Sequence, residues 1–339
     1  MPGAPHNRIL LVGDFPPPQG GLATHVEELL RAVRSRGSCC EVLDIGKGQL
    51  PADCVLPAGG VARFSAQLAS YAARGFRVHL HTSGANPKSW VLMQVCALTR
   101  APIVTLHSGL MPAFLRASPA RRAVARAVLR RYAAVIAVSE PIREALRECG
   151  VRGVQVMPAF LGAALQPGAP PAGFAELRAE AAPLYCAMVA PRPEYGASVL
   201  LRALATLLHQ RSHARLALYG AGSEALRVAG ARGFGELPRP QALALMAGCD
   251  VFVRPTLADG DSVSIREALA LGRPVVATSV GNRPPEARLV PPGDAEALAA
   301  AMLAAAEAAP ASRAGAAPGV LDRILSLYQE EACAASAAS

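Results

Sequence analysis

The feature that most constrains the fold of this 339-residue chain is a regular alternation of short apolar runs with helix-length segments. The apolar runs, such as RILLVG at 8–13 and APIVTLHSG at 101–109, do not alternate with polar residues. Continuous runs rich in β-branched residues are typical of parallel strands that helices cover on both faces. The pattern therefore predicts an α/β protein with doubly wound parallel sheets.

The alternation occurs twice, and a segment rich in proline, glycine and alanine at 163–173 separates the two series. Such a composition is typical of a linker. We therefore expect Rossmann-like domains over 1–165 and 174–318, followed by a C-terminal helical segment at 319–339. Ligands of such sheets bind at the carboxyl ends of the strands, which places the expected site between the two carboxyl edges.

The chain is basic, with a formal net charge of +9, and part of the excess lies in ARRAVARAVLRRYA at 120–133. Arg122, Arg126 and Arg130 are four residues apart and share one helical face. The residues leave open a solvated face or contact of the Arg121–Arg131 helix with an anionic membrane surface. No aromatic or glycine-rich RNA-binding pattern accompanies the charge, so nucleic acid is not an expected partner.

Cysteine usage and hydropathy indicate the compartment. The eight cysteines form no C-x-x-C pair, and several lie in apolar runs, as reduced thiols of a cytoplasmic protein do. The N-terminus does not read as a signal peptide, and no uncharged apolar stretch reaches about 18 residues. We expect a cytoplasmic protein, at most peripheral at the inner membrane face.

Two short stretches, one with paired glycines and one with two histidines, each allow a ligand-binding and a purely structural interpretation. Gly20 and Gly21 lie between an apolar run and a helix, where they indicate either a ligand near the backbone or a plain tight turn. His79 and His81 form an H-x-H pair that faces one side of a strand, but no third ligand is evident. The sequence therefore predicts no metal site.

The segment 254–278, RPTLADGDSVSIREALALGRPVVAT, carries the strongest chemical signal. A polar loop around Asp259 leads from a strand into a helix whose first turn would favour an anion such as a diphosphate. Ser264-Ile-Arg-Glu267 also fits a capping box, in which the glutamate only satisfies the start of the helix. The residues alone leave both interpretations open.

Together these stretches resemble the retaining family 4 glycosyltransferases of the GT-B fold. Asp259, seven residues, Glu267 and then ALALGRPVVA follow the family pattern of an acid, seven residues and a glutamate in a helix that ends in A-x-G-x-P-V-V-A. Gly20-Gly21 before a helix with His25 resembles the family's N-terminal glycine loop. IAVSEPIREAL, APRPEYG, LALYGAGSE and MAGCDVFVRPT follow in order, so the resemblance covers essentially the whole chain.

The resemblance implies two Rossmann-like domains that face each other across a cleft, with the last helix crossing back to the first domain. The implied reaction moves a sugar from a UDP or GDP sugar to a glycan, lipid-linked or small-molecule hydroxyl, with retention of configuration. It implies no metal and no cofactor besides the donor. Exopolysaccharide or cell-envelope glycan assembly is the implied setting.

The resemblance also implies roles for single residues. Glu267 would hydrogen-bond the ribose hydroxyls, Asp259 would hold sugar hydroxyls, and Arg192 would supply a cation to the leaving diphosphate. His107 would contact the transferred sugar or the acceptor hydroxyl. The remaining expected donor contacts are Gly20, Gly21, Tyr195, Gly220, Gly222, Gly235, Glu236, Asp261, Ser262 and Val263.

Two positions depart from the family pattern. The family pairs its phosphate-binding arginine with a lysine in P-E-K-G, whereas Tyr195 stands there in this chain. Loss of that cation would cost several kcal/mol of transition-state stabilisation unless Arg254 or Arg283 compensates. Asp259 replaces the usual glutamate. These departures keep open a catalytically degenerate nucleotide-sugar-binding protein, and a sugar-nucleotide epimerase is a third alternative.

Overall fold

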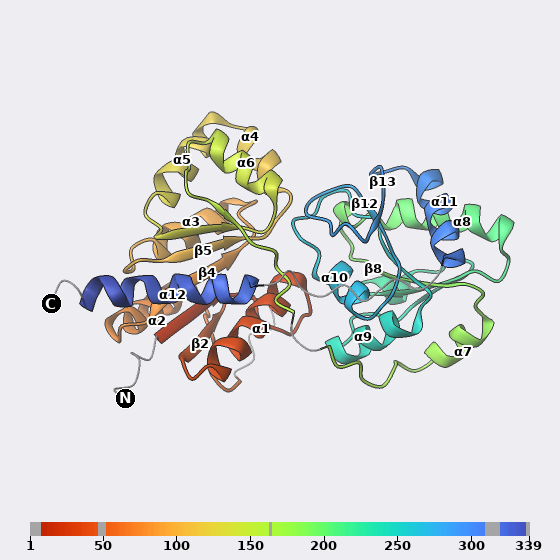
Figure 1. The fold of residues 1–339 in the computed structure, drawn as a ribbon, viewed down its shortest axis with the longest axis horizontal. Helices are drawn as coiled ribbons and strands as arrows, with labels where there is room; N and C mark the ends of the chain where they lie inside the picture. Colours follow the sequence, from red (N-terminus) through yellow and green to blue (C-terminus); the bar gives the residue numbers. More distant parts are fainter. Residues whose placement is uncertain (1–7, 47–51, 163–164, 309–318, 337–339) are drawn as a thin grey trace. The chain divides into compact units, whose positions relative to one another are not determined.

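The protein is described by a computed structural model that covers residues 8–46, 52–162, 165–308 and 319–336, with side chains described as far as residue 329. The chain divides into two compact units (Figure 1). The first comprises Met1–Leu161 with Ala317–Ser339, and the second comprises Gly162–Ala316. Both units are α/β, as the alternating apolar runs predict.

The first unit is built on a parallel seven-stranded sheet in the order β3-β2-β1-β4-β5-β6-β7. The chain runs from β1 to one edge and then returns to place β4 on the other side of β1, which creates a topological switch point between them. The strands are β1 (Arg8–Gly13), β2 (Cys39–Asp44), β3 (Val55–Pro57), β4 (Arg77–Thr82), β5 (Ile103–Leu106), β6 (Ala134–Ala137) and β7 (Gln155–Val156).

Helices cover both faces of this sheet, which explains why its strands read as continuous apolar runs. They are α1 (Gly21–Ser35), α2 (Val61–Ala73), α3 (Pro87–Cys96), α4 (Met111–Arg116), α5 (Pro119–Leu129), α6 (Glu140–Glu148) and α12 (Val320–Ser336). On one face, β1 packs against apolar residues of α1 and α12, among them Val26 and Leu29.

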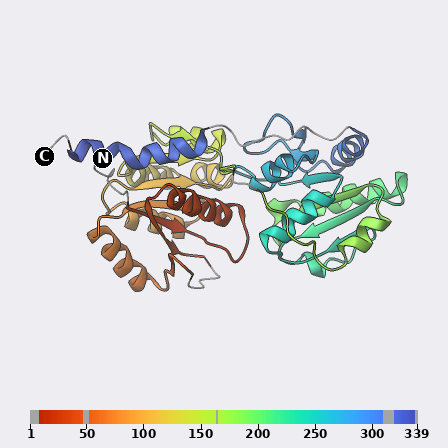
Figure 2. The same ribbon diagram turned by 60° about the horizontal axis from the view of Figure 1, so that its bottom comes forward.

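The last helix, α12, lies along the sheet of the first unit (Figure 2). It buries Val320, Ile324, Leu327 and Tyr328, which recur at helical spacing on one face. Its carbonyl at Leu327 accepts a hydrogen bond from Arg77 Nη1 at the start of β4. The first turns of α12 are therefore an integral part of the first unit's core.

The second unit contains a parallel six-stranded sheet in the order β10-β9-β8-β11-β12-β13. Its strands are β8 (Leu184–Met188), β9 (Arg215–Tyr219), β10 (Ala231–Gly233), β11 (Val251–Arg254), β12 (Val275–Thr278) and β13 (Arg288–Val290). Its helices are α7 (Phe174–Glu180), α8 (Ala197–Gln210), α9 (Arg239–Gly248), α10 (Val263–Ala270) and α11 (Ala295–Glu307).

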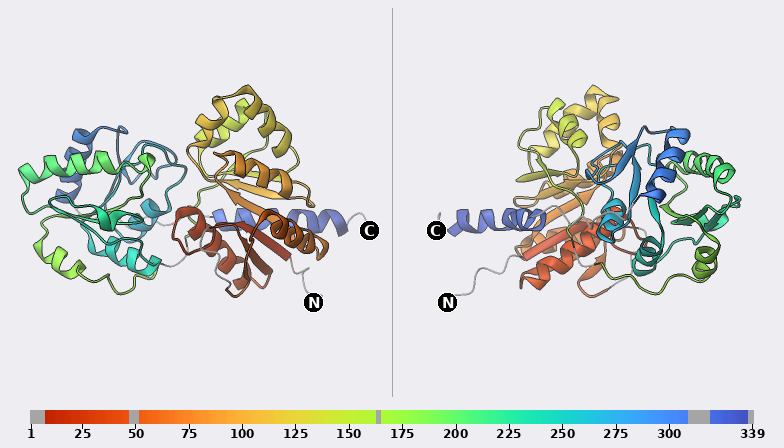
Figure 3. Two further views of the ribbon diagram at one scale, coloured as in Figure 1. Left: turned by 180° about the vertical axis from the view of Figure 1, so that it is seen from behind. Right: turned by 45° about the vertical axis from the view of Figure 1, so that its right-hand side comes forward.

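The second sheet also carries one hydrophobic core on each face. Helices α8 and α11 cover one face, and α7, α9 and α10 cover the other, as Figures 1 and 3 show. In β11, Val253 packs on the first side and Phe252 on the second, as the alternating direction of strand side chains requires. The prediction of two Rossmann-like, doubly wound units is confirmed.

The elements that the apolar pattern does not predict are short. Strands β3, β10 and β13 have three residues each and lie at sheet edges. An edge strand has fewer neighbours and therefore needs fewer apolar side chains, so its sequence signal is weak. Helix α4 has only six residues. Among the described helices, none combines the length and the apolar character needed to cross a bilayer.

Candidate functional site

The polar loop after β11 holds Asp259 between two buried arginines. Asp259 Oδ2 lies 3.5 Å from Arg254 Nε, at the end of β11, and 3.2 Å from Arg283 Nη2, in the loop after β12. Because β11 and β12 are neighbouring parallel strands, their carboxyl ends bring the two arginines to one place. Thr256 adds a hydroxyl 3.4 Å from the same carboxylate oxygen.

Asp261 is anchored separately, by a bidentate ion pair with Arg266 on α10. Arg266 Nη2 and Nε lie 2.7 and 2.9 Å from Asp261 Oδ1, and the aspartate side chain is only 1% exposed. Behind the loop, Asn282 N donates to the Gly260 carbonyl at 2.6 Å. Gly281 has a φ of +74°, and a Cβ there would meet the Asp259 and Gly260 carbonyls at 2.5 Å. The loop is therefore fixed in shape on both sides.

Helix α10 begins directly after Ser262, and its start argues against the capping-box interpretation of Glu267. Ser262, not Ser264, is the N-cap residue, and its side chain makes no capping hydrogen bond. Glu267 instead accepts a hydrogen bond at 2.8 Å from Arg239 Nε at the start of α9, with both side chains largely buried. The glutamate is thus held by a neighbouring helix, and Ser264 does not occupy the N-cap position that a capping box with Glu267 requires.

Arg192 and Tyr195, the expected phosphate contacts after β8, differ in their surroundings. The Arg192 side chain is 66% exposed and lies 4.0 Å from Glu194. Tyr195 closes a short 3-10 turn, η1 (Pro193–Tyr195), and its ring centroid lies 4.9 Å from the guanidinium carbon of Arg254. Gly196, with a φ of +70°, leaves no room for a Cβ beside the Pro255 carbonyl, so the glycine permits this close approach.

The glycine turns after β9 and β10 are tied to each other. Gly220 N donates to the Gly235 carbonyl at 2.7 Å. Gly235 N in turn donates to the buried Ser223 hydroxyl at 2.9 Å. Gly222, in the turn after β9, has a φ of +78°. Glu236, directly after Gly235, is exposed. The two turns that the resemblance placed around the phosphates and nucleobase therefore form one rigid corner of the second unit.

In the first unit, Gly20 is the N-cap of α1, and Gly21 is its first residue. The φ of Gly20 is −168°, which is extended backbone open to any residue, and a Cβ there would meet no atom within 4 Å. Neither conformation nor packing requires glycine at position 20. Position 20 therefore needs no glycine to form a turn, and the approach of a ligand to this backbone stays a prediction.

Four histidines converge at the carboxyl end of β4, next to the switch point. His79 and His81 lie on β4, His107 follows β5, and His25 comes from α1. His81 Nδ1 is 3.3 Å from His107 Nε2, and the rings of His79 and His81 are 4.1 Å apart. The sequence missed this cluster because the fold, and not sequence spacing, adds His25 and His107 to the H-x-H pair.

The environment keeps these imidazoles neutral. Burial lowers the pKa of His25 to about 4, against a smaller opposing effect of its 2.5 Å hydrogen bond with the Ala159 carbonyl. Burial also lowers the pKa of His79, His81 and His107, and the neighbouring rings lower it further. One nitrogen each from His25, His81 and His107 lie within 4.8 Å of one another. Such neutral rings could bind hydroxyl groups or a transition metal.

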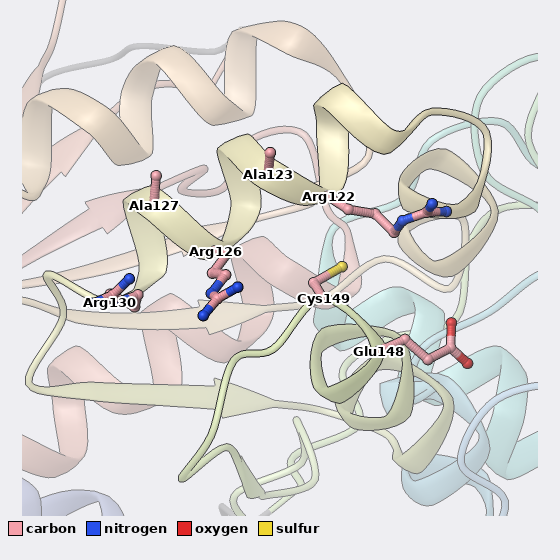
Figure 4. A pocket seen from close by; sticks show the side chains of 7 residues that line it. All are labelled: Arg122, Ala123, Arg126, Ala127, Arg130, Glu148 and Cys149. Carbon is pink, nitrogen blue, oxygen red and sulfur yellow. The ribbon is translucent and has the colours of Figure 1, made fainter.

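The arginines of α5 line a pocket of about 530 Å³ together with the end of α6 (Figure 4). Arg122, Arg126 and Arg130 contribute its basic side, and Glu148 and Cys149 lie opposite. In the part of the chain that the structure describes, none of these three arginines forms an ion pair with an acidic side chain. Their positive charge is therefore available to an outside anion.

Comparison with known proteins agrees with this architecture. Residues 19–160 match the family model described as Glycosyltransferase Family 4, and residues 183–308 match Glycosyl transferases group 1. No curated protein sequence matches the chain.

Solved structures share the fold at low identity. HepE of Anabaena, in complex with UDP and glucose, is 17% identical, with a TM-score of 0.67 and coverage of 98% of this chain and 100% of that one. Sucrose-phosphate synthase of Thermosynechococcus elongatus is 21% identical, with a TM-score of 0.66 and coverage of 98% and 97%. The two family models together span most of the chain, and both sheets match the GT-B architecture. The chain therefore belongs to the family 4 glycosyltransferases of the GT-B fold.

Proposed function

We propose that the chain is a retaining glycosyltransferase whose second unit binds a UDP or GDP sugar and whose first unit binds the hydroxyl acceptor. The observation that carries this proposal is the loop from Asp259 to Glu267, in which partners on other elements orient both acids. A fixed acid binds sugar or ribose hydroxyls without first losing conformational freedom. HepE, which shares the fold, was crystallised with UDP and glucose, and this supports UDP as a donor nucleotide.

On the donor side, each part of the site has a distinct task. Glu267, held by Arg239, binds the ribose hydroxyls, and Asp259 binds hydroxyls of the transferred sugar. The amide groups from Asp261 to Val263 lie at the start of α10, where free N–H groups and the helix dipole favour phosphate. The corner formed by Gly220, Gly222 and Gly235, together with Glu236, flanks the phosphates and nucleobase.

In the reaction, the bond between the anomeric carbon and the diphosphate oxygen breaks, and its electron pair stays on the phosphate. The acceptor hydroxyl oxygen bonds to the same face of the anomeric carbon, and its proton passes to the leaving phosphate. Arg192, whose side chain is exposed to solvent, stabilises the charge that develops there. His107 binds the sugar or acceptor hydroxyl as a neutral imidazole. No metal or cofactor other than the donor is required.

The acceptor is a glycan or lipid-linked hydroxyl in polysaccharide assembly, at the cytoplasmic face of a membrane. Support comes from the basic pocket on α5, whose three arginines have no acidic partner among the described residues. Co-sedimentation with vesicles tests this part. Vesicles containing anionic phosphatidylglycerol should pull down the wild type but not an Arg122→Gln/Arg126→Gln/Arg130→Gln variant. Equal sedimentation of both proteins would contradict the proposed membrane contact.

A donor panel with simple acceptors tests the activity itself. We expect release of UDP or GDP that depends on the acceptor, and NMR should show that the product keeps the donor's anomeric configuration. Donor isomerisation without an acceptor would favour the epimerase alternative, and donor binding without turnover would favour the binding-protein alternative. The binding-protein alternative rests on Tyr195 in place of lysine and Asp259 in place of glutamate. Arg254 and Arg283 place positive charge beside Asp259, which supports turnover.

A further inference from the structure

Two arginines share one carboxylate beside the acidic loop of the second unit. The side chains of Arg254, Arg283 and Asp259 are 9%, 3% and 13% exposed, so all three charges are buried. Two positive charges face one negative charge, which leaves an excess of one buried positive charge. The other acids of the segment, Asp261 and Glu267, already pair with Arg266 and Arg239.

The two guanidinium groups also keep unused hydrogen-bond donors. Arg283 donates from Nε to the Thr278 carbonyl at 3.0 Å and from Nη2 to Thr256 Oγ1 at 2.9 Å. In both Arg254 and Arg283, however, Nη1 is buried and has no hydrogen-bond partner. A buried ionised donor without a partner is costly, and both side chains therefore favour an added anion.

Burial lowers the pKa of Arg283, which is the direction expected for a cation with too little compensating charge. The pKa of Arg254 is raised instead, because the effect of burial is outweighed by the Asp259 carboxylate together with the neighbouring tyrosines, so the uncompensated charge lies mainly on Arg283. Arginine still stays protonated in proteins, so the excess charge cannot be removed by losing a proton. Only an anion from outside the cluster neutralises it.

The position of the cluster indicates which anion it accepts. Arg254 lies against the ring of Tyr195, at 4.9 Å. Tyr195 stands at the position where the resemblance to family 4 places a phosphate-binding lysine. The guanidinium group of Arg254, at the end of β11, therefore lies beside residue 195, where a lysine side chain would otherwise begin. Arg283 comes from the neighbouring loop and meets the same carboxylate.

We propose that Arg254 and Arg283 form a two-arginine clamp that binds the diphosphate of the donor in place of a lysine at position 195. This proposal rests on the proposed glycosyltransferase function. In the reaction, the clamp stabilises the negative charge that the diphosphate gains when it leaves the anomeric carbon. Tyr195 is a positioning residue, because its ring lies against the guanidinium group of Arg254.

Titration calorimetry with UDP, uridine and inorganic pyrophosphate tests the clamp. Arg254→Met and Arg283→Met should each weaken UDP and pyrophosphate binding by about 10- to 100-fold, the value of a charge-assisted hydrogen bond, and leave uridine binding unchanged. In the Arg254→Met background, Tyr195→Lys should restore much of the lost UDP affinity, because it returns a cation to the same space. A purely structural role would lower the melting temperature but would not separate UDP from uridine.

Arg273→Met is the matched control. Arg273 is a partly buried arginine after α10 whose Nη1 donates to the Cys249 carbonyl at 3.0 Å, and its Nε has no partner. Its loss should leave UDP binding unchanged.

Unchanged UDP affinity in both clamp variants would overturn the clamp and leave the glycosyltransferase proposal intact. A wild-type protein that binds neither pyrophosphate nor UDP, GDP or ADP would overturn both proposals.

Discussion

The buried histidine cluster makes the first unit sensitive to acid, and His25 allows this effect to be calculated. Burial lowers the pKa of His25 to about 4 in the folded protein, against 6.5 for an exposed histidine. Between these values the unfolded chain binds a proton that the folded chain does not. The stability that neutral His25 contributes is therefore complete above about pH 6.5 and is lost as the pH falls towards 4.

The size of the loss follows from the pKa difference. Each tenfold change in proton affinity corresponds to about 1.4 kcal/mol, so the full contribution of His25 is about 3 kcal/mol. About 2 kcal/mol of this is lost between pH 7 and pH 5. His79, His81 and His107 act in the same direction, because burial also lowers their pKa values.

Urea unfolding at pH 7 and pH 5 measures this loss. Trp90 is the only tryptophan of the chain and is buried on α3, so its fluorescence reports on the unit that contains the cluster. His25→Gln removes the titrating group. The loss in free energy of unfolding between pH 7 and pH 5 should therefore be about 2 kcal/mol smaller in this variant than in the wild type.

Val26→Ala, at the buried neighbouring position of α1, is the control. It should lower stability at both pH values and keep the wild-type pH dependence. If His25→Gln also kept the wild-type pH dependence, His25 would not be held neutral by burial.

Three further predictions concern the second unit. Glu267→Gln should weaken binding of the donor nucleotide about tenfold in titration calorimetry, because a neutral amide accepts weaker hydrogen bonds from ribose hydroxyls. Arg192→Ala should lower kcat and leave KM nearly unchanged, since its charge acts on the leaving diphosphate; a change in KM alone would contradict that role. Arg266→Met removes the bidentate partner of buried Asp261 and should cost about 3 kcal/mol in urea unfolding, whereas Arg211→Met, which breaks an exposed ion pair, should cost less than about 1 kcal/mol.

The fold was predictable because its signal is local and repeated. Each long central strand, such as β1 or β8, is a continuous apolar run, and helices on both faces require that pattern. The three-residue strand β13 is too short to produce such a signal. The acidic loop was recognisable because Asp259 and Glu267 lie on one continuous segment.

Contacts between distant segments could not be predicted in the same way. The histidine cluster combines His25 of α1 with His79 and His81 of β4 and with His107, which follows β5. This combination depends on how α1 packs on the strands. Arg254 and Arg283 were identifiable as candidate cations, but only the neighbouring positions of β11 and β12 bring both to Asp259. The Ser264–Glu267 spacing fitted a capping box, yet Arg239 from another helix binds the glutamate.

The central claim is that the second unit binds a nucleotide-sugar donor, and a thermal-shift panel tests it most directly. The wild-type protein would be melted with UDP, GDP, ADP, CMP and their common sugar conjugates. A ligand at 100 times its dissociation constant stabilises the folded state by about 2.7 kcal/mol, which raises Tm measurably. We predict that UDP or GDP and its sugar conjugate raise Tm, and that Glu267→Gln reduces the shift. No shift with any nucleotide at millimolar concentration would contradict the claim.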